Sequence, residues 1–255
     1  MTSYGRFAYL YDQLMEDIPY DNWLDITAIY KEKYQVKGSK LLDVACGTGE
    51  LSCRFAMRGF DVTGVDLSED MLAVAKVKSE TEGFHIPFFQ QNMVELEDLG
   101  QFDFITIFCD SLNYLSSEQE VIATFQGVST HLKDNGLFLF DVHSEYKIEE
   151  IFKDQTFTYI GDDLCYIWNC FEGEYPLSVE HELTFFVKDH QKSEKYERVE
   201  EFHFQRTFSI EHYKKWLEQS GFETLHVLGD LINQPVSDKS ERILFVARKK
   251  MDHIK

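Results

Sequence analysis

The stretch that decides the fold is LLDVACGTGE, residues 41–50. Its apolar run carries one acidic residue, Asp43, and leads into a turn with two glycines, Gly47 and Gly49. A buried strand that passes through a glycine turn into a helix is typical of nucleotide-binding sites in open α/β sheets. Glycine lets the backbone turn tightly and approach a ligand closely. We therefore expect a strand at 40–45 and a ligand beside the turn.

The residues that follow the turn distinguish it from a dinucleotide fingerprint. That fingerprint has a third glycine three positions after the second, where this chain has Ser52. Glu50 opens the next helix and is expected to repel a pyrophosphate at the helix N-terminus. Asp43 and Glu50 together favour a ligand with cationic groups and no phosphate. S-adenosylmethionine, which has a sulfonium and an amino group, meets that description.

Asp66 is the second acidic residue of the predicted ligand site. It ends the apolar segment 60–66 and lies about 20 residues after the glycines, which is the usual spacing for a carboxylate that binds a ribose. Such a carboxylate suits NAD and S-adenosylmethionine equally well. The alternative is that Asp66, with Ser68 behind it, only begins the next helix.

With these motifs, the chain resembles the class I S-adenosylmethionine-dependent methyltransferases of the small-molecule type, a family found among bacterial methyltransferases. The resemblance covers nearly the whole chain. It rests on residues 4–12, 41–50, 62–68, 90–93, 102–110 and 132–140. Asn92 stands where this family more often has Asp. The resemblance implies a Rossmann-like sheet of seven strands with helices on both faces, whose last strand runs antiparallel beside the fifth.

Hydrophobic periodicity agrees with this fold class. Alternating helices and short strands predict a doubly wound parallel sheet. Strands are expected at 40–45, 60–66, 85–90, 102–108, 136–142, 223–229 and 242–248. Helices are expected at 7–15, at 21–34 and after Ser68, Ser117 and Ser209, whereas the short link 91–101 leaves little room for one.

An insertion interrupts the sheet after its fifth strand. Period-two alternation over 156–208 predicts an antiparallel sheet of three or four strands. We therefore expect a cofactor-binding domain at 1–144 and 209–255, with helices in 1–36 over the cofactor, and an inserted β subdomain at 145–208. The insertion is interpreted as a lid over the acceptor pocket. A homodimer surface is the alternative, and the two roles are compatible.

Composition limits the partners. The net charge of −20 and the scattered basic residues argue against a nucleic-acid partner. No apolar run reaches the roughly 20 residues that span a bilayer, and no secretory signal is visible, so the expected location is cytoplasmic. Five cysteines without a Cys-x-x-Cys pair predict reduced thiols, with neither a disulfide framework nor a metal site.

The predicted site divides into cofactor and acceptor residues. Cofactor contacts are expected from Tyr11, Trp23, Asp43, Ala45, Gly47, Gly49, Asp66, Leu67, Met71, Asn92, Met93 and Cys109. For Tyr11 and Trp23, ordinary helix packing is the alternative. His143, Asp110 and Tyr114 follow the fourth and fifth strands, where they are candidates for contact with the acceptor. His143 is the preferred candidate base because its ordinary pKa lies near neutrality.

The predicted function is methyl transfer from S-adenosylmethionine to a small-molecule acceptor by in-line displacement, which leaves S-adenosylhomocysteine. Positioning supplies much of the acceleration of such a reaction. The alternatives are an NAD(P)-dependent oxidoreductase, which uses the same sheet, and a non-catalytic module that only binds S-adenosylmethionine. The missing third glycine and Glu50 argue against the oxidoreductase.

Overall fold

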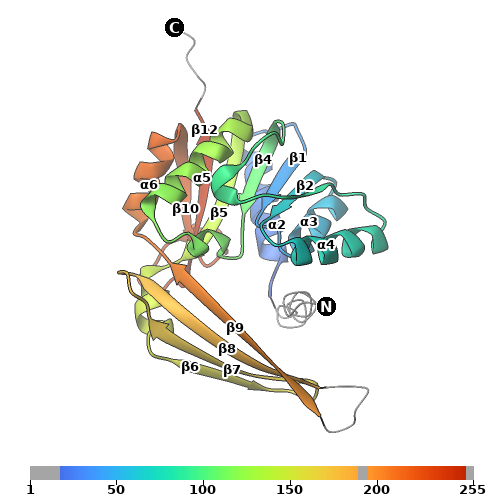
Figure 1. Cartoon of the computed structure of the whole chain (residues 1–255). Helices are drawn as coiled ribbons and strands as arrows, with labels where there is room; N and C mark the ends of the chain where they lie inside the picture. Colours follow the sequence, from blue (N-terminus) through green and yellow to red (C-terminus); the bar gives the residue numbers. More distant parts are fainter. Residues whose placement is uncertain (1–17, 189–194, 251–255) are drawn as a thin grey trace.

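The computed structural model describes residues 18–188 and 195–250. Two sheets account for most of this part of the chain (Figure 1). The larger sheet has eight strands in the order β11-β10-β12-β5-β4-β1-β2-β3. Its strands are β1 Lys40–Val44, β2 Asp61–Asp66, β3 Phe88–Gln90, β4 Phe102–Ile107, β5 Leu132–His143, β10 Phe222–Gly229, β11 Gln234–Pro235 and β12 Arg242–Lys249.

The pairing of the strands confirms the predicted fold class. β1 lies between β2 and β4 and runs parallel to both, and β4 runs parallel to β5. β12 is antiparallel to β5, with Phe245 opposite Phe140. The seven predicted strands are all present, and the two-residue β11 adds an eighth at the edge beyond β10.

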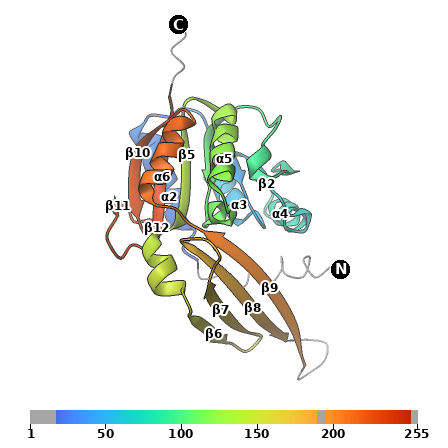
Figure 2. The same ribbon diagram turned by 60° about the vertical axis from the view of Figure 1, so that its left-hand side comes forward.

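Helices cover both faces of the main sheet (Figure 2). The helices are α2 Asp21–Lys33, α3 Glu50–Met57, α4 Glu69–Thr81, α5 Glu118–His131 and α6 Ile210–Gln219. Neighbouring residues of β1 face opposite sides. Leu41 packs with residues of α2 and α3, and Leu42 packs with residues of α5 and α6. Because both faces of β1 are covered, its apolar residues run without interruption instead of alternating with polar ones.

Local signals start the helices where the sequence places them. Ser117 and Glu120 form a capping box at the start of α5. The hydroxyl of Ser68 accepts a hydrogen bond from the amide of Met71 in α4, and Ser209 caps α6 in the same way. The link between β3 and β4 contains only the short helix η1, Met93–Glu95, as its length predicts.

The smaller sheet is antiparallel and has the order β6-β7-β8-β9. Its strands are β6 Thr156–Ile160, β7 Leu164–Glu172, β8 Ser178–Lys188 and β9 Tyr196–Arg206. It follows β5 through the short helix η3, Lys147–Phe152, and extends beyond the carboxyl end of β5 (Figure 1). The predicted antiparallel insertion is therefore present, with four strands.

The structure describes all five cysteines, and each is a free thiol. In residues 18–188 and 195–250, no helix has both the length and the apolar character that crossing a bilayer requires.

Candidate active site

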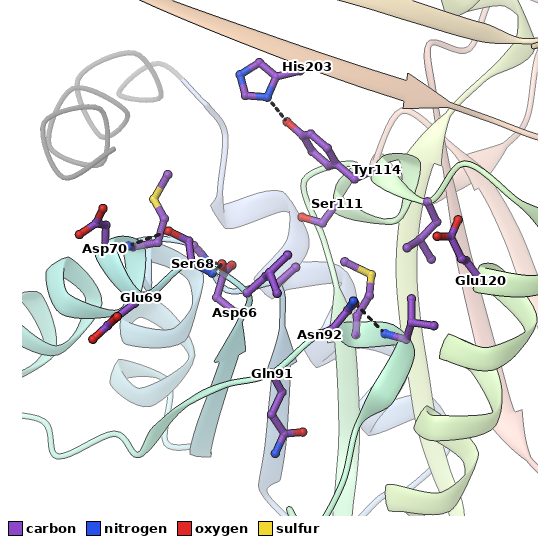
Figure 3. Close-up of a pocket in the computed structure, with 17 residues that line it drawn as sticks. Asp66, Ser68, Glu69, Asp70, Gln91, Asn92, Ser111, Tyr114, Glu120 and His203 are labelled. Carbon is purple, nitrogen blue, oxygen red and sulfur yellow. Dashed lines mark hydrogen bonds between the residues drawn. The ribbon is translucent and has the colours of Figure 1, made fainter. Parts of the chain in front are cut away.

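A cavity of about 1070 Å³ lies at the carboxyl ends of β1, β2 and β4 (Figure 3). Open α/β sheets bind ligands at this edge. Its walls come from the glycine turn, the start of α4, the η1 segment, the short helix η2 (Ser111–Tyr114) and strand β9. The residues that line it are Ala45, Gly47, Asp66, Leu67, Ser68, Glu69, Asp70, Met71, Gln91, Asn92, Met93, Val94, Ser111, Tyr114, Leu115, Glu120 and His203.

The two glycines of the turn have different surroundings. Gly47 lines the cavity with a φ of +54°, and a Cβ placed on it would have no atom within 4 Å. Gly49 has a φ of +74°, but a Cβ there would lie 2.9 Å from the Cβ of Ala75 in α4. Gly47 therefore leaves open space beside the backbone, whereas Gly49 allows α3 and α4 to pack closely.

Asp66 lies at the cavity wall, where two backbone amides hold its carboxylate. The Gly47 amide donates to Oδ2 and the Ser68 amide donates to Oδ1, both at 2.8 Å. Burial raises the pKa of Asp66, and the hydrogen bonds from these amides partly offset that effect. The carboxylate is thus fixed beside the turn, in the place that the spacing of the two motifs predicts.

The four residues predicted to surround the adenine all line the cavity. They are Leu67, Met71, Asn92 and Met93. Asn92 also accepts a hydrogen bond from the amide of Val94 at 3.1 Å, which caps η1. Apolar side chains of this kind suit a flat base, because they bury its faces without a charge.

Across the cavity from Asp66 and Asn92 lie a tyrosine of the short helix η2 and a histidine of the smaller sheet (Figure 3). Tyr114 ends η2, and His203 lies on β9 of the smaller sheet (Figure 3). The hydroxyl of Tyr114 lies 3.3 Å from Nδ1 of His203. The sequence analysis missed His203. The alternation around it predicts a strand, but no local signal tells which of the two faces of that strand meets the cavity.

His143 and Asp110 lie behind the cavity wall and do not line it. Only 3% of the His143 side chain is exposed, and its Nε2 lies 3.1 Å from Oε1 of Gln205 and 3.3 Å from Oδ2 of Asp110. Arg242 binds Oδ1 of Asp110 at 2.7 Å. Although burial alone would raise it, the pKa of Asp110 is held well below its usual range by His143 and Arg242. His143 thus lies in a buried ion network, whereas the sequence suggested that it faces the acceptor.

Trp23 belongs to the core, in agreement with the packing alternative. It is 2% exposed, and its Nε1 donates to Oδ1 of Asp141 at 2.6 Å. The same oxygen accepts from the Cys109 amide at 3.0 Å, and Arg242 pairs with the other carboxylate oxygen of Asp141. Trp23 is therefore linked to the loop after β4 through the carboxylate of Asp141. Tyr11 lies outside the described residues.

Cys109 also lies outside the cavity lining. Its φ of +55° places it at a sharp turn after β4. Burial, together with the nearby Asp141 carboxylate, raises the pKa of its thiol well above the ordinary value. Because the thiolate is the reactive form of cysteine, this environment disfavours a nucleophilic role.

Asp43 lies beneath the glycine turn, and only 2% of it is exposed. Its Oδ2 accepts from the Ser52 hydroxyl at 2.6 Å, and its Oδ1 accepts from the Thr106 hydroxyl at 3.1 Å. Burial raises the pKa of Asp43 to about 6. Asp43 does not line the cavity, and both its oxygens accept hydrogen bonds from hydroxyls. A contact with the amino group of the cofactor through water therefore stays a prediction.

Glu50 has its own cationic partners. Lys78 lies 2.9 Å from one carboxylate oxygen and Arg54 lies 2.7 Å from the other. Burial raises the pKa of Glu50, but these two cations outweigh that effect and the net shift is downward. Glu50 is therefore ionised and paired, so its direct repulsion of a phosphate is weaker than the sequence suggests.

The charges of the cavity lining fit S-adenosylmethionine. Asp66, Glu69, Asp70 and Glu120 contribute carboxylates, and no Lys or Arg is among the described residues that line the cavity. A pyrophosphate would meet negative charge without a cationic partner. A sulfonium and an ammonium group would be stabilised by these carboxylates.

Comparison with known proteins gives the same family. A methyltransferase domain model matches residues 41–136, which extend from β1 into β5. A Geobacillus sp. (strain WCH70) protein named as a methyltransferase is 51% identical over 248 residues, which are 97% of this chain and 100% of the relative. YqeM of Bacillus subtilis (strain 168), also named as a methyltransferase, is 46% identical over 96% of this chain and 97% of its own length.

A solved structure extends the likeness to the whole fold. The S-adenosylmethionine-dependent methyltransferase from Clostridium acetobutylicum ATCC 824 is 30% identical to this chain, with a TM-score of 0.88. The match covers 97% of this chain and 99% of that one, so it includes the inserted sheet. The likeness decides between the two nucleotide ligands in favour of S-adenosylmethionine. This chain belongs to the family of S-adenosylmethionine-dependent methyltransferases.

Proposed function

We propose that the protein transfers the methyl group of S-adenosylmethionine to a small molecule bound in the cavity beside Tyr114 and His203. The observation that carries this proposal is the size and lining of the cavity. Its volume of about 1070 Å³ slightly exceeds the roughly 300–1,000 Å³ typical of ligand pockets, which leaves room for a cofactor and an acceptor. The adenosine-binding features lie on one side, and Tyr114 and His203 lie on the other.

The cofactor residues take the following roles in this proposal. The carboxylate of Asp66, held by two amides, accepts hydrogen bonds from the ribose hydroxyls. Leu67 and Met71 contact the faces of the adenine, and Asn92 and Met93 contact its edge and face. The open space beside Gly47 admits the methionine portion. Ala45 contributes to the same wall.

The reaction makes limited demands on the protein. S-adenosylmethionine supplies an electrophilic methyl carbon with a thioether as its leaving group. The protein must hold the acceptor atom in line with that carbon, exclude water and receive a proton where the acceptor has to lose one. The acidic lining and the net charge of −20 favour a neutral or cationic small acceptor over the phosphate backbone of a nucleic acid.

The inserted sheet is proposed as a lid on this acceptor space. Strand β9 supplies His203 to the cavity wall, so the sheet contributes directly to the shape of the pocket. A homodimer through the same sheet is a second proposal. It is supported by large apolar side chains that β6 and β9 leave exposed, among them Ile160 and Phe202. Analytical ultracentrifugation tests the dimer.

Two measurements test the methyltransferase proposal. Thermal shifts with S-adenosylmethionine, S-adenosylhomocysteine and NAD identify the ligand, because a compound that binds only the folded state raises Tm. Both sulfur nucleosides should raise Tm, whereas NAD should not. Asp66→Ala should lose the shift and stay folded. Asp61→Ala, at the exposed start of the same strand, is the matched control and should keep it.

The second measurement separates an enzyme from a module that only binds the cofactor. The protein is incubated with S-adenosylmethionine labelled in its methyl group and with a bacterial extract filtered to small molecules. Label that moves into a new small molecule supports the proposal. Label that moves only when macromolecules are present, or stabilisation by NAD alone, contradicts it.

A further inference from the structure

We propose that Tyr114 and His203 act as a proton-accepting pair, in which the tyrosine hydroxyl takes the acceptor's proton and passes its own to the imidazole of His203. This assignment rests on the proposed function and adds a catalytic pair to it. Tyr114 is one of the residues predicted from the sequence to contact the acceptor, whereas His203 is not.

The first support is geometric. Tyr114 and His203 both line the cavity, on the side opposite Asp66 and Asp70 (Figure 3). The tyrosine oxygen lies 3.3 Å from Nδ1 of the imidazole, and the two ring centroids are 5.8 Å apart. The pair spans the junction of the two sheets, because η2 follows β4 of the main sheet and β9 belongs to the insertion.

The second support is that the two segments are fastened to each other next to the pair. The side-chain amide of Gln205 donates to Oδ2 of Asp110 at 3.1 Å, and the side-chain amide of Asn113 donates to the carbonyl of Arg206 at 2.8 Å. Gln205 follows His203 by two residues, so both project from the same face of β9. Asn113 immediately precedes Tyr114. These hydrogen bonds hold η2 against β9, and so they fix the distance between the side chains of Tyr114 and His203.

The chemical step balances without any further reactant. A lone pair on the acceptor's oxygen or nitrogen forms a bond to the methyl carbon, and the carbon–sulfur bond breaks with its electron pair remaining on sulfur. The acceptor's proton moves to the Tyr114 oxygen as the tyrosine proton moves to Nδ1 of His203. The positive charge therefore leaves the sulfonium and reappears on the imidazole, so the charge of the whole cavity does not change.

The surroundings of His203 suit a base. Burial lowers the pKa of His203, which keeps the imidazole neutral and able to accept a proton near pH 7. The titratable groups on the strands around it are His181, directly opposite on β8, and Glu201, two residues away on the same face of β9.

Histidine titration by NMR tests the assignment without knowledge of the acceptor. The pKa of His203 is measured in the complexes with S-adenosylmethionine and S-adenosylhomocysteine, and its signal is assigned from the spectrum of His203→Asn. Loss of the sulfonium should raise the pKa of His203 by about one unit, the size expected for a unit charge within about 10 Å at an effective dielectric constant of about 20.

A second tyrosine–histidine pair provides the control. The Tyr34 hydroxyl lies 2.8 Å from Nε2 of His226, and neither residue lines the cavity. The pKa of His226 should be the same in both complexes. Equal pKa values for His203 in the two complexes overturn the assignment, although the proposed function survives. Failure of both nucleosides to bind in calorimetry overturns the proposed function and this pair with it.

Rates of label transfer to the filtered extract give an independent readout. Tyr114→Phe and His203→Asn should each lower the rate by about 100-fold or more, the contribution typical of general base catalysis. Their affinity for S-adenosylhomocysteine, measured by calorimetry, should change by less than about threefold. Tyr34→Phe and His226→Asn should transfer label as the unmodified protein does. Rates within about threefold of that protein for the two cavity variants overturn the assignment.

Discussion

Replacing Asp43 with asparagine should remove the part of the pH dependence of stability that comes from this carboxyl group. Burial raises the pKa of Asp43 to about 6, from an ordinary value of 3.8. The folded state therefore binds this proton more tightly than the unfolded state, so the contribution of Asp43 to stability increases as pH falls through the window from about 6 to 4. Asparagine has the same shape and no charge. The Ser52 and Thr106 hydroxyls, which now donate to Asp43, can donate to or accept from its amide.

The size of the effect follows from the two pKa values. At about 1.4 kcal/mol for each pKa unit, the ionised carboxylate lowers the free energy of unfolding by about 3 kcal/mol well above pH 6, relative to its protonated form. About 1 kcal/mol of that difference develops between pH 5 and pH 7. Asp43→Asn should therefore gain stability relative to the unmodified protein by about 1 kcal/mol over this interval.

Urea denaturation at pH 5, 6 and 7 measures the difference between the two proteins. Asp61→Asn, at the exposed end of the neighbouring strand β2, is the matched control and should show no change of this kind. The prediction is refuted if the difference in free energy of unfolding between the variant and the unmodified protein is the same at pH 5 and pH 7. It is also refuted if the variant loses stability relative to the unmodified protein as pH rises. Either result would show that ionisation of Asp43 beneath the turn does not destabilise the fold.

Three further substitutions test other parts of the site. Arg242→Met should lower the free energy of unfolding by about 3–5 kcal/mol in urea denaturation, because it leaves the buried carboxylates of Asp110 and Asp141 without their cation; a loss below about 1 kcal/mol contradicts this. Gly47→Ala should lower the free energy of unfolding by about 1–2 kcal/mol, because alanine is strained in the left-handed backbone conformation of this residue. It should also weaken S-adenosylhomocysteine binding at least tenfold in calorimetry; unchanged binding would show that the cofactor does not use the open space beside Gly47. Gln205→Leu should lower the free energy of unfolding by about 1–3 kcal/mol, because Asp110 and His143 lose their hydrogen bonds to its amide. The same variant should transfer label more slowly. An unchanged rate would show that β9 keeps its place without this contact.

The parts of the fold that sequence predicts are those fixed by neighbouring residues. The central strand β1 could be recognised because Leu41 and Leu42 are both fully buried, on opposite faces of a covered sheet. The start of α5 could be recognised because Ser117 and Glu120 satisfy each other's backbone within one turn. Neither feature depends on a distant part of the chain.

Strand ends were less predictable, since they depend on the neighbouring strand. The strand expected at 85–90 is only Phe88–Gln90, which pairs with the end of β2. Pro87 has no amide hydrogen to donate to a ladder, so pairing starts after it. Conversely, β5 begins at Leu132 instead of residue 136. The turn residues 133–136 are accommodated as an irregularity between the pairs that Phe102 and Phe104 of β4 make.

The acceptor side of the site could not be read from sequence. His143 and His203 lie in or at the end of strands, and nothing in their neighbouring residues indicates that one is sealed behind the wall while the other lines the cavity. The difference comes from three separate segments: Asp110 and Gln205 contact the His143 ring, and Arg242 binds Asp110. The docking of the inserted sheet on the loop after β4 adds Gln205 to this group.

Ser52 and Glu50 set the turn apart from a dinucleotide fingerprint. Their effect on the choice of ligand is less direct than their positions in the sequence indicate. Ser52 replaces the third glycine and donates to Asp43, so a glycine there would leave a buried carboxylate with Thr106 as its one remaining side-chain donor. Glu50 is neutralised by Lys78 and Arg54, so it does not present an unpaired charge to the cavity. The negative charge that a phosphate would meet comes instead from Asp66 and the other carboxylates of the lining. Preference for a sulfonium nucleoside is therefore attributed to the cavity wall, whereas Ser52 acts beneath the wall by holding the buried carboxylate of Asp43.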